Sequence, residues 1–201
     1  MTDDYLDKVY ALKTDADRRA LYDDWAEQYD NDLASQGYVT PARCAATLAT
    51  SPLPKDAPML DMGCGTGLLG RALAAQGFTQ IDGADVSARM MEEARKRGVY
   101  GRLLDLSETS APKGHYEAVA AAGVIGTGAA PPSVFDQCLD LLPKGGLFCF
   151  SFNDHTLEEP AYTDRLNAAV ADGKARILSE EIGDHIKGLG SRAMVYLLER
   201  Q

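Results

Sequence analysis

The chain has 201 residues, the size of one ordinary domain, and 45% of them are hydrophobic and 25% charged. This composition excludes a disordered linker and a collagen-like repeat. Lys and Arg number 20 against 30 Asp and Glu, so the formal net charge is −10. We therefore expect neither nucleic acid nor an anionic membrane surface as a partner.

The acidic residues are concentrated at the start of the chain. Residues 1–32 hold ten carboxylates and four basic side chains, which we interpret as a solvated helix face. The first ten residues contain no apolar signal segment. Four cysteines without a Cys-x-x-Cys pair are typical of free thiols in a reducing compartment. We expect a cytoplasmic protein with no disulfide framework and no metal site.

Two helices are predicted before residue 50. Thr14 and Asp17 have the spacing of a capping box at the start of the first helix. An apolar residue then recurs at every fourth position on one face: Leu21, Trp25, Tyr29 and Leu33. Thr40 and Pro41 predict the N-cap and first turn of a second helix, which extends to about Leu48.

After a linker that begins at Ser51, predicted strands alternate with predicted helices. The expected strands are 57–60, 79–84, 99–104, 116–122, 147–152, 175–186 and 193–199. The expected helices are 68–76, 88–97, 133–142 and 162–171. This alternation predicts an α/β fold with a parallel sheet and helices on both faces. We expect residues 51–201 to form one domain and residues 1–50 to form a helical lid.

Three carboxylates follow three predicted strands, at the edge of the sheet where ligands bind in this fold class: Asp61, Asp85 and Asp105. Between the first two lies a glycine loop with Gly63, Gly65 and Gly67, which opens a helix. Such a loop lets the backbone approach a ligand closely and points free N–H groups at it. Asp85 comes 18 residues after Gly67 and can accept both hydroxyls of a ribose, so a nucleoside site is predicted.

Two nucleoside cofactors fit such a site. The run from Gly65 to Gly70 matches the dinucleotide pattern G-x-G-x-x-G. However, Asp61 precedes the glycines, where it can meet a cationic ammonium group. The chain also lacks a Tyr-x-x-x-Lys pair and has no room for a separate substrate domain. The residues therefore favour another nucleoside over NAD.

Asp61 and the three glycines after it resemble motif I of the class I S-adenosylmethionine (SAM)-dependent methyltransferases of the small-molecule type. Further matches follow in the expected order: Asp85, Asp105, the run from Tyr116 to Val119 and the run from Leu141 to Leu147. The resemblance implies a Rossmann-like sheet of seven mostly parallel strands. Their order would be 3-2-1-4-5-7-6, with strand 7 antiparallel and helices on both faces.

The resemblance also implies roles for single residues toward SAM. The glycine loop, with Cys64 inside it, would lie against the methionine part, and Asp61 would hold the ammonium side. Asp85 would bind the ribose, while Val86 would pack on the adenine.

Other expected cofactor residues come from later strands and from the lid. Asp105 would accept from the adenine amino group, and Leu106 would flank the ring. The backbone at Ala122 and Gly123 would pass beside the sulfonium, and Tyr29 would close over the methionine carboxylate.

The acceptor side of the site is less defined by the sequence. A general base helps only if the acceptor arrives protonated. His155 follows the fifth predicted strand and is the first candidate for such a base, ahead of His185. Tyr22 and Trp25 are candidates for the substrate pocket.

No sizeable cap interrupts the predicted sheet, so we expect methyl transfer from SAM to an unidentified small-molecule acceptor. The Asn-Pro-Pro-Tyr signature of amino-directed nucleic-acid and protein methyltransferases is absent, which disfavours DNA as the acceptor. The alternatives are a non-catalytic SAM-binding protein and an NAD-linked oxidoreductase. The sequence leaves the oligomeric state open.

Overall fold

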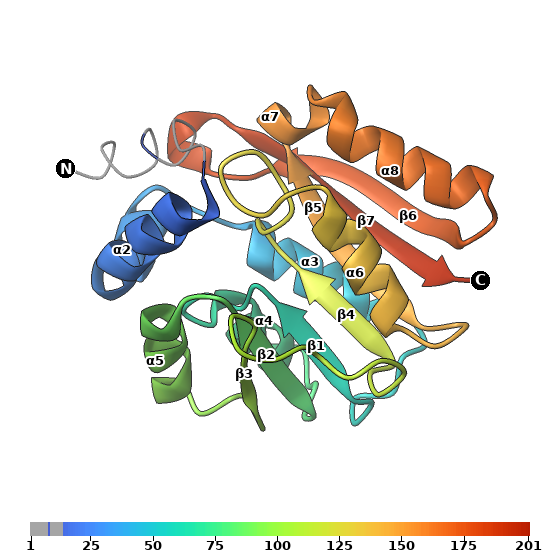
Figure 1. Cartoon of the computed structure of the whole chain (residues 1–201), viewed down its shortest axis with the longest axis horizontal. Coiled ribbons are helices and arrows are strands. Elements are labelled where there is room, and N and C mark those ends of the chain that lie inside the picture. Colours follow the sequence, from blue (N-terminus) through green and yellow to red (C-terminus); the bar gives the residue numbers. More distant parts are fainter. Residues whose placement is uncertain (1–7, 9–13) are drawn as a thin grey trace.

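The computed structural model describes Lys8 and residues 14–201, so residues 1–7 and 9–13 of the expected lid lie outside the described residues. The fold is built on one sheet of seven strands in the order β3-β2-β1-β4-β5-β7-β6 (Figure 1). Five strands run parallel from β3 to β5, while β7 pairs antiparallel with both β5 and β6. The expected strand order and the antiparallel seventh strand are confirmed.

The strands fall in the expected order, with differences at their ends. Their bounds are β1 Met59–Met62, β2 Ile81–Asp85, β3 Leu103–Asp105, β4 Ala118–Ala121, β5 Leu147–Asn153, β6 Ala175–Asp184 and β7 Arg192–Arg200. Strand β3 is much shorter than expected. It pairs with β2 alone, from Gly83↔Leu103 to Asp85↔Asp105, at the edge of the sheet.

The helices cover both faces of the sheet. Their bounds are α2 Asp15–Ser35, α3 Thr40–Ala49, α4 Leu68–Ala75, α5 Ala88–Lys96, α6 Ser133–Leu141, α7 Asp154–Leu157 and α8 Pro160–Ala171, with a 3-10 turn η1 at Lys187–Leu189. Helices α6 and α8 lie on one face, and α3 and α4 on the other (Figure 1). None of the described helices has the length and apolar character that crossing a membrane requires.

Local capping chemistry explains where several helices begin. Thr14 Oγ1 accepts from the backbone N–H of Asp17, and Ser87 Oγ accepts from that of Met90, as expected. The short helix α7, which was not expected, is capped by Asn153 Oδ1 accepting from Thr156 N.

The expected cap at Thr40 is wrong. The N-cap of α3 is Val39, and Thr40 is the first helical residue. Its hydroxyl is buried and lies 2.8 Å from His185 Nδ1, which is 145 residues away in sequence. The Thr40 side chain, which local spacing predicted to cap the helix, therefore makes a tertiary contact with His185 instead.

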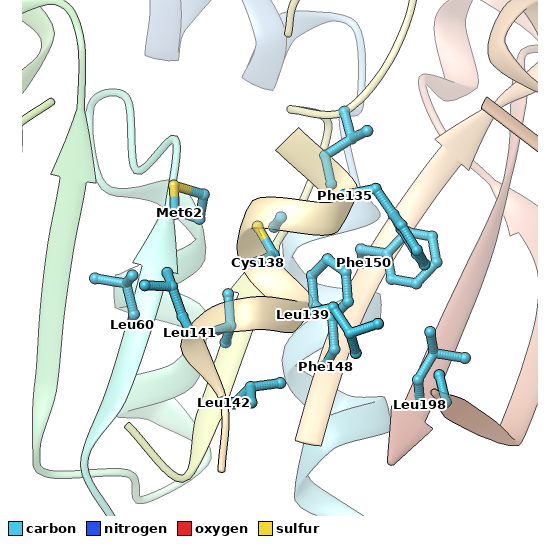
Figure 2. Close-up of a cluster of buried hydrophobic side chains, with 14 of the residues drawn as sticks. Leu60, Met62, Phe135, Cys138, Leu139, Leu141, Leu142, Phe148, Phe150 and Leu198 are labelled. Carbon is cyan, nitrogen blue, oxygen red and sulfur yellow. The ribbon is translucent and has the colours of Figure 1, made fainter. Parts of the chain in front are cut away.

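Two apolar layers hold the sheet between its helices. On the α6 side, aromatic side chains of β5 pack against Phe135 of α6, and the rings of Phe148 and Phe150 lie 4.6 Å apart between centroids (Figure 2). On the other side, Leu48 of α3 and Leu73 of α4 pack against the opposite face of the central strands.

Within the expected lid, α2 and α3 are attached in different ways. Helix α3 contributes Cys44, Ala45 and Leu48 to a core layer of the sheet. Its Arg43 guanidinium donates to three backbone carbonyls of the β6–β7 hairpin. Helix α2 belongs instead to a small separate cluster, in which Trp25 and Leu33 pack with Ile186.

Candidate active site

A cavity of about 570 Å³ opens at the carboxyl ends of the parallel strands, beside α2. Its volume lies in the usual range of about 300–1,000 Å³ for small-ligand sites. We call it the cofactor cavity. Tyr22 and most of the expected cofactor residues line it: Tyr29, Gly63, Cys64, Gly65, Asp85, Val86, Leu106, Ala122 and Gly123. Three expected residues lie outside this lining: Asp61, Gly67 and Asp105.

The glycine loop shapes the floor of the cofactor cavity. Gly63 has φ +66°, and a Cβ built there would lie 2.5 Å from Val124 Cγ1. Both the left-handed backbone and the close neighbour therefore require glycine at this position. Burial raises the pKa of the Cys64 thiol, so this side chain remains protonated and is not a nucleophile.

Asp85 is the best-oriented polar group of the cavity. Its Oδ2 accepts from Gly65 N at 2.8 Å and its Oδ1 from Ser87 N at 2.9 Å. Burial raises the pKa of the carboxyl, and these two N–H bonds oppose the rise. Because each oxygen retains a second lone pair, the carboxylate can still accept two further hydrogen bonds. Beside it Val86 is 47% exposed, an apolar surface toward the cavity.

Asp105 is placed differently from Asp85. Its Oδ1 accepts from the backbone N–H of Ser107 at 2.8 Å and from its hydroxyl at 2.5 Å. These bonds lower the pKa of the carboxyl. Leu106 and Ser107 contribute to the cavity wall beside it. The Asp105 carboxylate thus fixes the loop whose residues Leu106 and Ser107 line the cavity. A contact between Asp105 and the adenine remains a prediction.

Asp61 is buried beneath the glycine loop. Its Oδ2 accepts from the Tyr100 hydroxyl at 2.7 Å, while Oδ1 has no hydrogen-bond partner among the described residues. The Tyr100 hydroxyl occupies the space that a Cβ at Gly70 would need. Burial raises the pKa of Asp61 to about 7, against the opposing Tyr100 hydrogen bond. A cationic or donor group near Oδ1 would favour the charged carboxylate.

The raised pKa of Asp61 predicts how stability depends on pH. Between about pH 4 and pH 7 the folded protein retains a proton that the unfolded chain has released. The contribution of Asp61 to the free energy of unfolding of the ligand-free protein should therefore fall by roughly 2–4 kcal/mol as pH rises through this window, while His185, whose pKa is lowered by burial, contributes in the opposite direction. Asp61→Asn should flatten that part of the profile. Thermal unfolding of both proteins at pH 5 and pH 8 measures the difference, and parallel profiles would contradict the assignment.

Carboxylates of α2 fasten this helix to the cofactor cavity. Asp30 accepts from Thr66 Oγ1 at 2.5 Å and pairs with Arg97, and Asp23 accepts from Ser87 Oγ at 2.5 Å. The interpretation of the acidic start as a solvated face is therefore incomplete, because these acids bind the glycine loop and α5.

A second, smaller cavity of about 70 Å³ adjoins the first, and we call it the inner chamber. The two cavities share Tyr22, Tyr29, Tyr38, Gly123 and Ala129 in their walls. The Tyr38 hydroxyl lies where a Cβ at Gly123 would be, so only glycine allows this approach. Gly123 N donates to Ser151 Oγ at 2.9 Å, which fixes the backbone between the cavities.

The expected substrate residues Tyr22 and Trp25 both line the inner chamber. The Tyr22 and Trp25 rings stack at 6.3 Å between centroids, and the Tyr29 ring meets Trp25 edge-on at 4.7 Å. Trp25 is only 1% exposed and donates from Nε1 to Asp32 at 2.8 Å. Most of its surface therefore serves packing, and a minor part faces the chamber.

Comparison with known proteins identifies the family to which the chain belongs. The sequence pattern of a family described as a methyltransferase domain matches residues 35–188, more than half of the chain. The chain belongs to the SAM-dependent methyltransferases. The family match confirms the resemblance seen in the glycine loop. SAM is the cofactor that membership of this family implies.

Two sequence relatives are similar to this methyltransferase. Methyltransferase-like protein 27 of Homo sapiens is 36% identical over 143 residues, which cover 68% of this chain and 58% of that protein. The ubiquinone biosynthesis O-methyltransferase of Xylella fastidiosa (strain 9a5c) is 32% identical over 111 residues, which cover 50% of this chain and 44% of that protein. The chain thus spans about half the length of the curated relatives it matches.

The fold is also similar to that of a solved methyltransferase. The crystal structure of magnesium protoporphyrin IX methyltransferase from Synechocystis PCC 6803, with bound SAM, matches with a TM-score of 0.62 and 18% identity. The match covers 98% of this chain and 90% of that one. The shared architecture and the family together decide against the NAD-linked alternative.

The histidines of the methyltransferase lie in three different settings. His155, the first candidate base, is exposed on an outer cavity of about 500 Å³. His185 is buried and lines both that outer cavity and the inner chamber. His115 is exposed and contacts Arg102 near the opposite ends of the strands. In the described part of the chain, no three His, Cys, Asp or Glu side chains gather as metal ligands would.

Sequence reasoning missed two residues of the site. Tyr38 had no motif to identify it, although it follows Gly37, a positive-φ residue at the end of α2. Thr40 was interpreted as a cap. Both come close to the site because an isolated bridge pairs Tyr38 with Ile186, near the end of the chain.

The contacts of Asp30 predict how α2 is retained on the methyltransferase. Asp30→Ala removes the partner of both Thr66 and Arg97, so α2 should open more often. We expect amide protection in α2 to fall about tenfold or more, since hydrogen bonds to charged groups contribute about 1.5–3 kcal/mol. Hydrogen exchange measures this, with the exposed Asp24→Ala as the matched control. Equal protection in the two variants would show that Asp30 does not hold the helix.

Proposed function

We propose that this methyltransferase binds SAM in the cofactor cavity and methylates a small molecule whose reacting end enters the inner chamber. The observation that carries the proposal is the shared wall at Gly123 and Tyr38, where the two cavities meet. A cofactor in one cavity and an acceptor in the other would face each other across this point.

The residues of the cofactor cavity fit the parts of SAM. Asp85 has two free lone pairs for the ribose hydroxyls, and exposed Val86 offers an apolar surface for the adenine. The glycine loop can lie along the methionine part, with Tyr29 above it on α2. Asp61 lies outside the cavity lining, so its buried, unpartnered Oδ1 would meet the ammonium side through a donor that bridges to it.

The size of the inner chamber supports a small acceptor. At about 70 Å³ it is far smaller than the cofactor cavity of about 570 Å³, so it admits only the reacting end of a molecule. The names of two similar proteins refer to ubiquinone biosynthesis and to magnesium protoporphyrin IX, which are small-molecule chemistries. The net charge of −10 opposes a nucleic-acid acceptor. We place the enzyme in the cytoplasm because its cysteines suit a reducing compartment.

The protein's contribution to the reaction is alignment and the exclusion of water. When bound, SAM supplies an electrophilic methyl group on a positively charged sulfur. Helix α2 covers the site with Tyr22, Tyr29 and buried Trp25, which would exclude water from the shared wall. In this role residues 15–35 would be the covering part of the lid expected at residues 1–50.

Calorimetric titration tests the proposal. S-adenosylhomocysteine (SAH), the product of the cofactor, should bind with micromolar affinity, and NAD should not bind. A panel of small acceptors then follows, with SAH release as the signal. Binding of NAD without SAH would refute the cofactor assignment. SAH binding with methylation of proteins or nucleic acids, but of no small molecule, would refute the acceptor class.

A further inference from the structure

Three cavities of the protein lie in series. The inner chamber shares wall residues with the cofactor cavity on one side and with the outer cavity on the other. The outer cavity and the inner chamber meet at four residues: Thr127, Asn153, His185 and Ile186. An acceptor whose body occupies the outer cavity would thus pass His185 on its way to the shared wall at Gly123.

The imidazole of His185 is held at this junction from one side. The residue is 7% exposed, and its Nδ1 lies 2.8 Å from Thr40 Oγ1. The Tyr38 ring packs edge-on against it at 5.3 Å between centroids. The backbone is fixed as well, since His185 N donates to Ser191 O and Val39 N donates to His185 O. Among the described residues only Thr40 lies within hydrogen-bond distance of a ring nitrogen, and the residue lines both the inner chamber and the outer cavity.

The charges around His185 favour a neutral ring. Burial is the main cause that lowers its pKa to about 4, and Arg43 and His155 act in the same direction. The Asp154 carboxylate opposes them and would stabilise a transient imidazolium. At neutral pH the ring therefore has a lone pair available to accept a proton.

We propose that His185 is the general base of this methyltransferase, that Thr40 is its positioning residue, and that the acceptor is a hydroxyl compound. This inference rests on the proposed function. In the step, the acceptor O–H bond breaks and its proton passes to Nε2. A bond forms between that oxygen and the methyl carbon, and the electron pair of the broken carbon–sulfur bond stays on sulfur. The imidazolium Nδ1–H donates to Thr40 Oγ1, and the proton leaves later through the outer cavity.

The surroundings select a hydroxyl among the common acceptors. Asp154, Glu158 and Glu159 line the outer cavity and repel a carboxylate. An ammonium group has no lone pair with which to attack the methyl carbon, and the same three carboxylates would stabilise its charged form. A hydroxyl is neutral on arrival and becomes strongly acidic as its oxygen gains the methyl group, so a weak base suffices.

Nuclear magnetic resonance of the imidazole nitrogens tests the geometry without any acceptor. His185 should carry its proton on Nδ1 and a lone pair on Nε2, and Thr40→Val should shift the balance of the two tautomers. His115→Gln is the matched control and should leave the His185 signals unchanged. A proton on Nε2 in the wild-type protein would overturn the proposal.

The kinetic test compares two probes, phenol and 4-nitrophenol, with SAM at pH 8. Phenol has a pKa of about 10 and needs a base, whereas 4-nitrophenol is largely ionised. His185→Gln should lower kcat/KM about 100-fold or more for phenol and less than about tenfold for 4-nitrophenol. Thr40→Val should show the same pattern in weaker form.

Equal losses on the two phenols would assign His185 a structural role and overturn the proposal. If His155→Gln instead lowered kcat/KM for phenol far more than for 4-nitrophenol, His155 would be the base, and the proposal for His185 would be overturned. SAH titration separates this result from failure of the proposed function. If wild-type protein binds SAH but methylates neither phenol, the hydroxyl assignment is overturned while the cofactor assignment stands.

Discussion

Replacement of Asp85 by alanine is expected to weaken SAH binding at least about 100-fold. The carboxylate is held by Gly65 N and Ser87 N, so both of its oxygens are oriented before any ligand arrives. Hydrogen bonds to a charged group contribute about 1.5–3 kcal/mol each, and two of them account for a loss of that size. Calorimetric titration with SAH measures the change.

A matched variant makes this result specific. Asp105 also ends a parallel strand, but its Oδ1 is used by Ser107 and its side chain lies outside the cavity lining. Asp105→Ala should therefore weaken SAH binding by less than Asp85→Ala does. The thermal unfolding of both variants shows whether the loop has collapsed. Unchanged SAH affinity in a folded Asp85→Ala protein would refute the ribose assignment.

The second large effect concerns stability. Phe150→Ala should lower the free energy of unfolding by about 3–5 kcal/mol, because it removes a fully buried ring from a close-packed layer. Between ring centroids, Tyr196 stacks on it at 5.0 Å, Phe135 and Phe152 meet it edge-on at 5.5 and 5.0 Å, and Phe148 lies 4.6 Å away. Four neighbours around one side chain leave little room for the site to collapse. Urea unfolding of the variant measures the loss.

A control on the edge strand β6 separates this packing effect from a loss of apolar area alone. Leu178 is 37% exposed, so Leu178→Ala should change the free energy of unfolding by less than about 1 kcal/mol. A loss as small as this in Phe150→Ala would show that the aromatic layer does not stabilise the sheet.

Local signals predicted the structure of the glycine loop and of the strand and helix ends around it. Gly63 and Gly67 have positive φ values, as a tight loop before a helix requires, and Asp85 ends β2 as the alternating pattern indicated. Ser87 caps α5 through its own hydroxyl. In each case the residue types and spacing that determine the structure lie within a few positions of one another.

The walls of the inner chamber could not be predicted in the same way, because their contacts join distant segments. Thr40 meets His185 across 145 residues, and Tyr38 reaches Gly123 from a turn that has no motif. Because Asp30 lies in a run of acidic residues, the sequence predicts a solvated carboxylate. In the structure this carboxylate accepts a hydrogen bond from Thr66 and forms an ion pair with Arg97. Hydrophobic periodicity identifies buried faces but not the partners of polar side chains.

The different attachment of α2 and α3 bears on how such an enzyme can diversify. Helix α3 shares its core with the sheet, so changes there endanger folding, whereas α2 rests on an aromatic cluster and a few carboxylates. That same α2 supplies Tyr22, Trp25 and Tyr29 to the wall of the inner chamber. With the acceptor placed there as proposed, substrate choice would depend largely on one replaceable segment. A transplanted α2 would then introduce a new preference while leaving nucleoside recognition and the sheet unaltered.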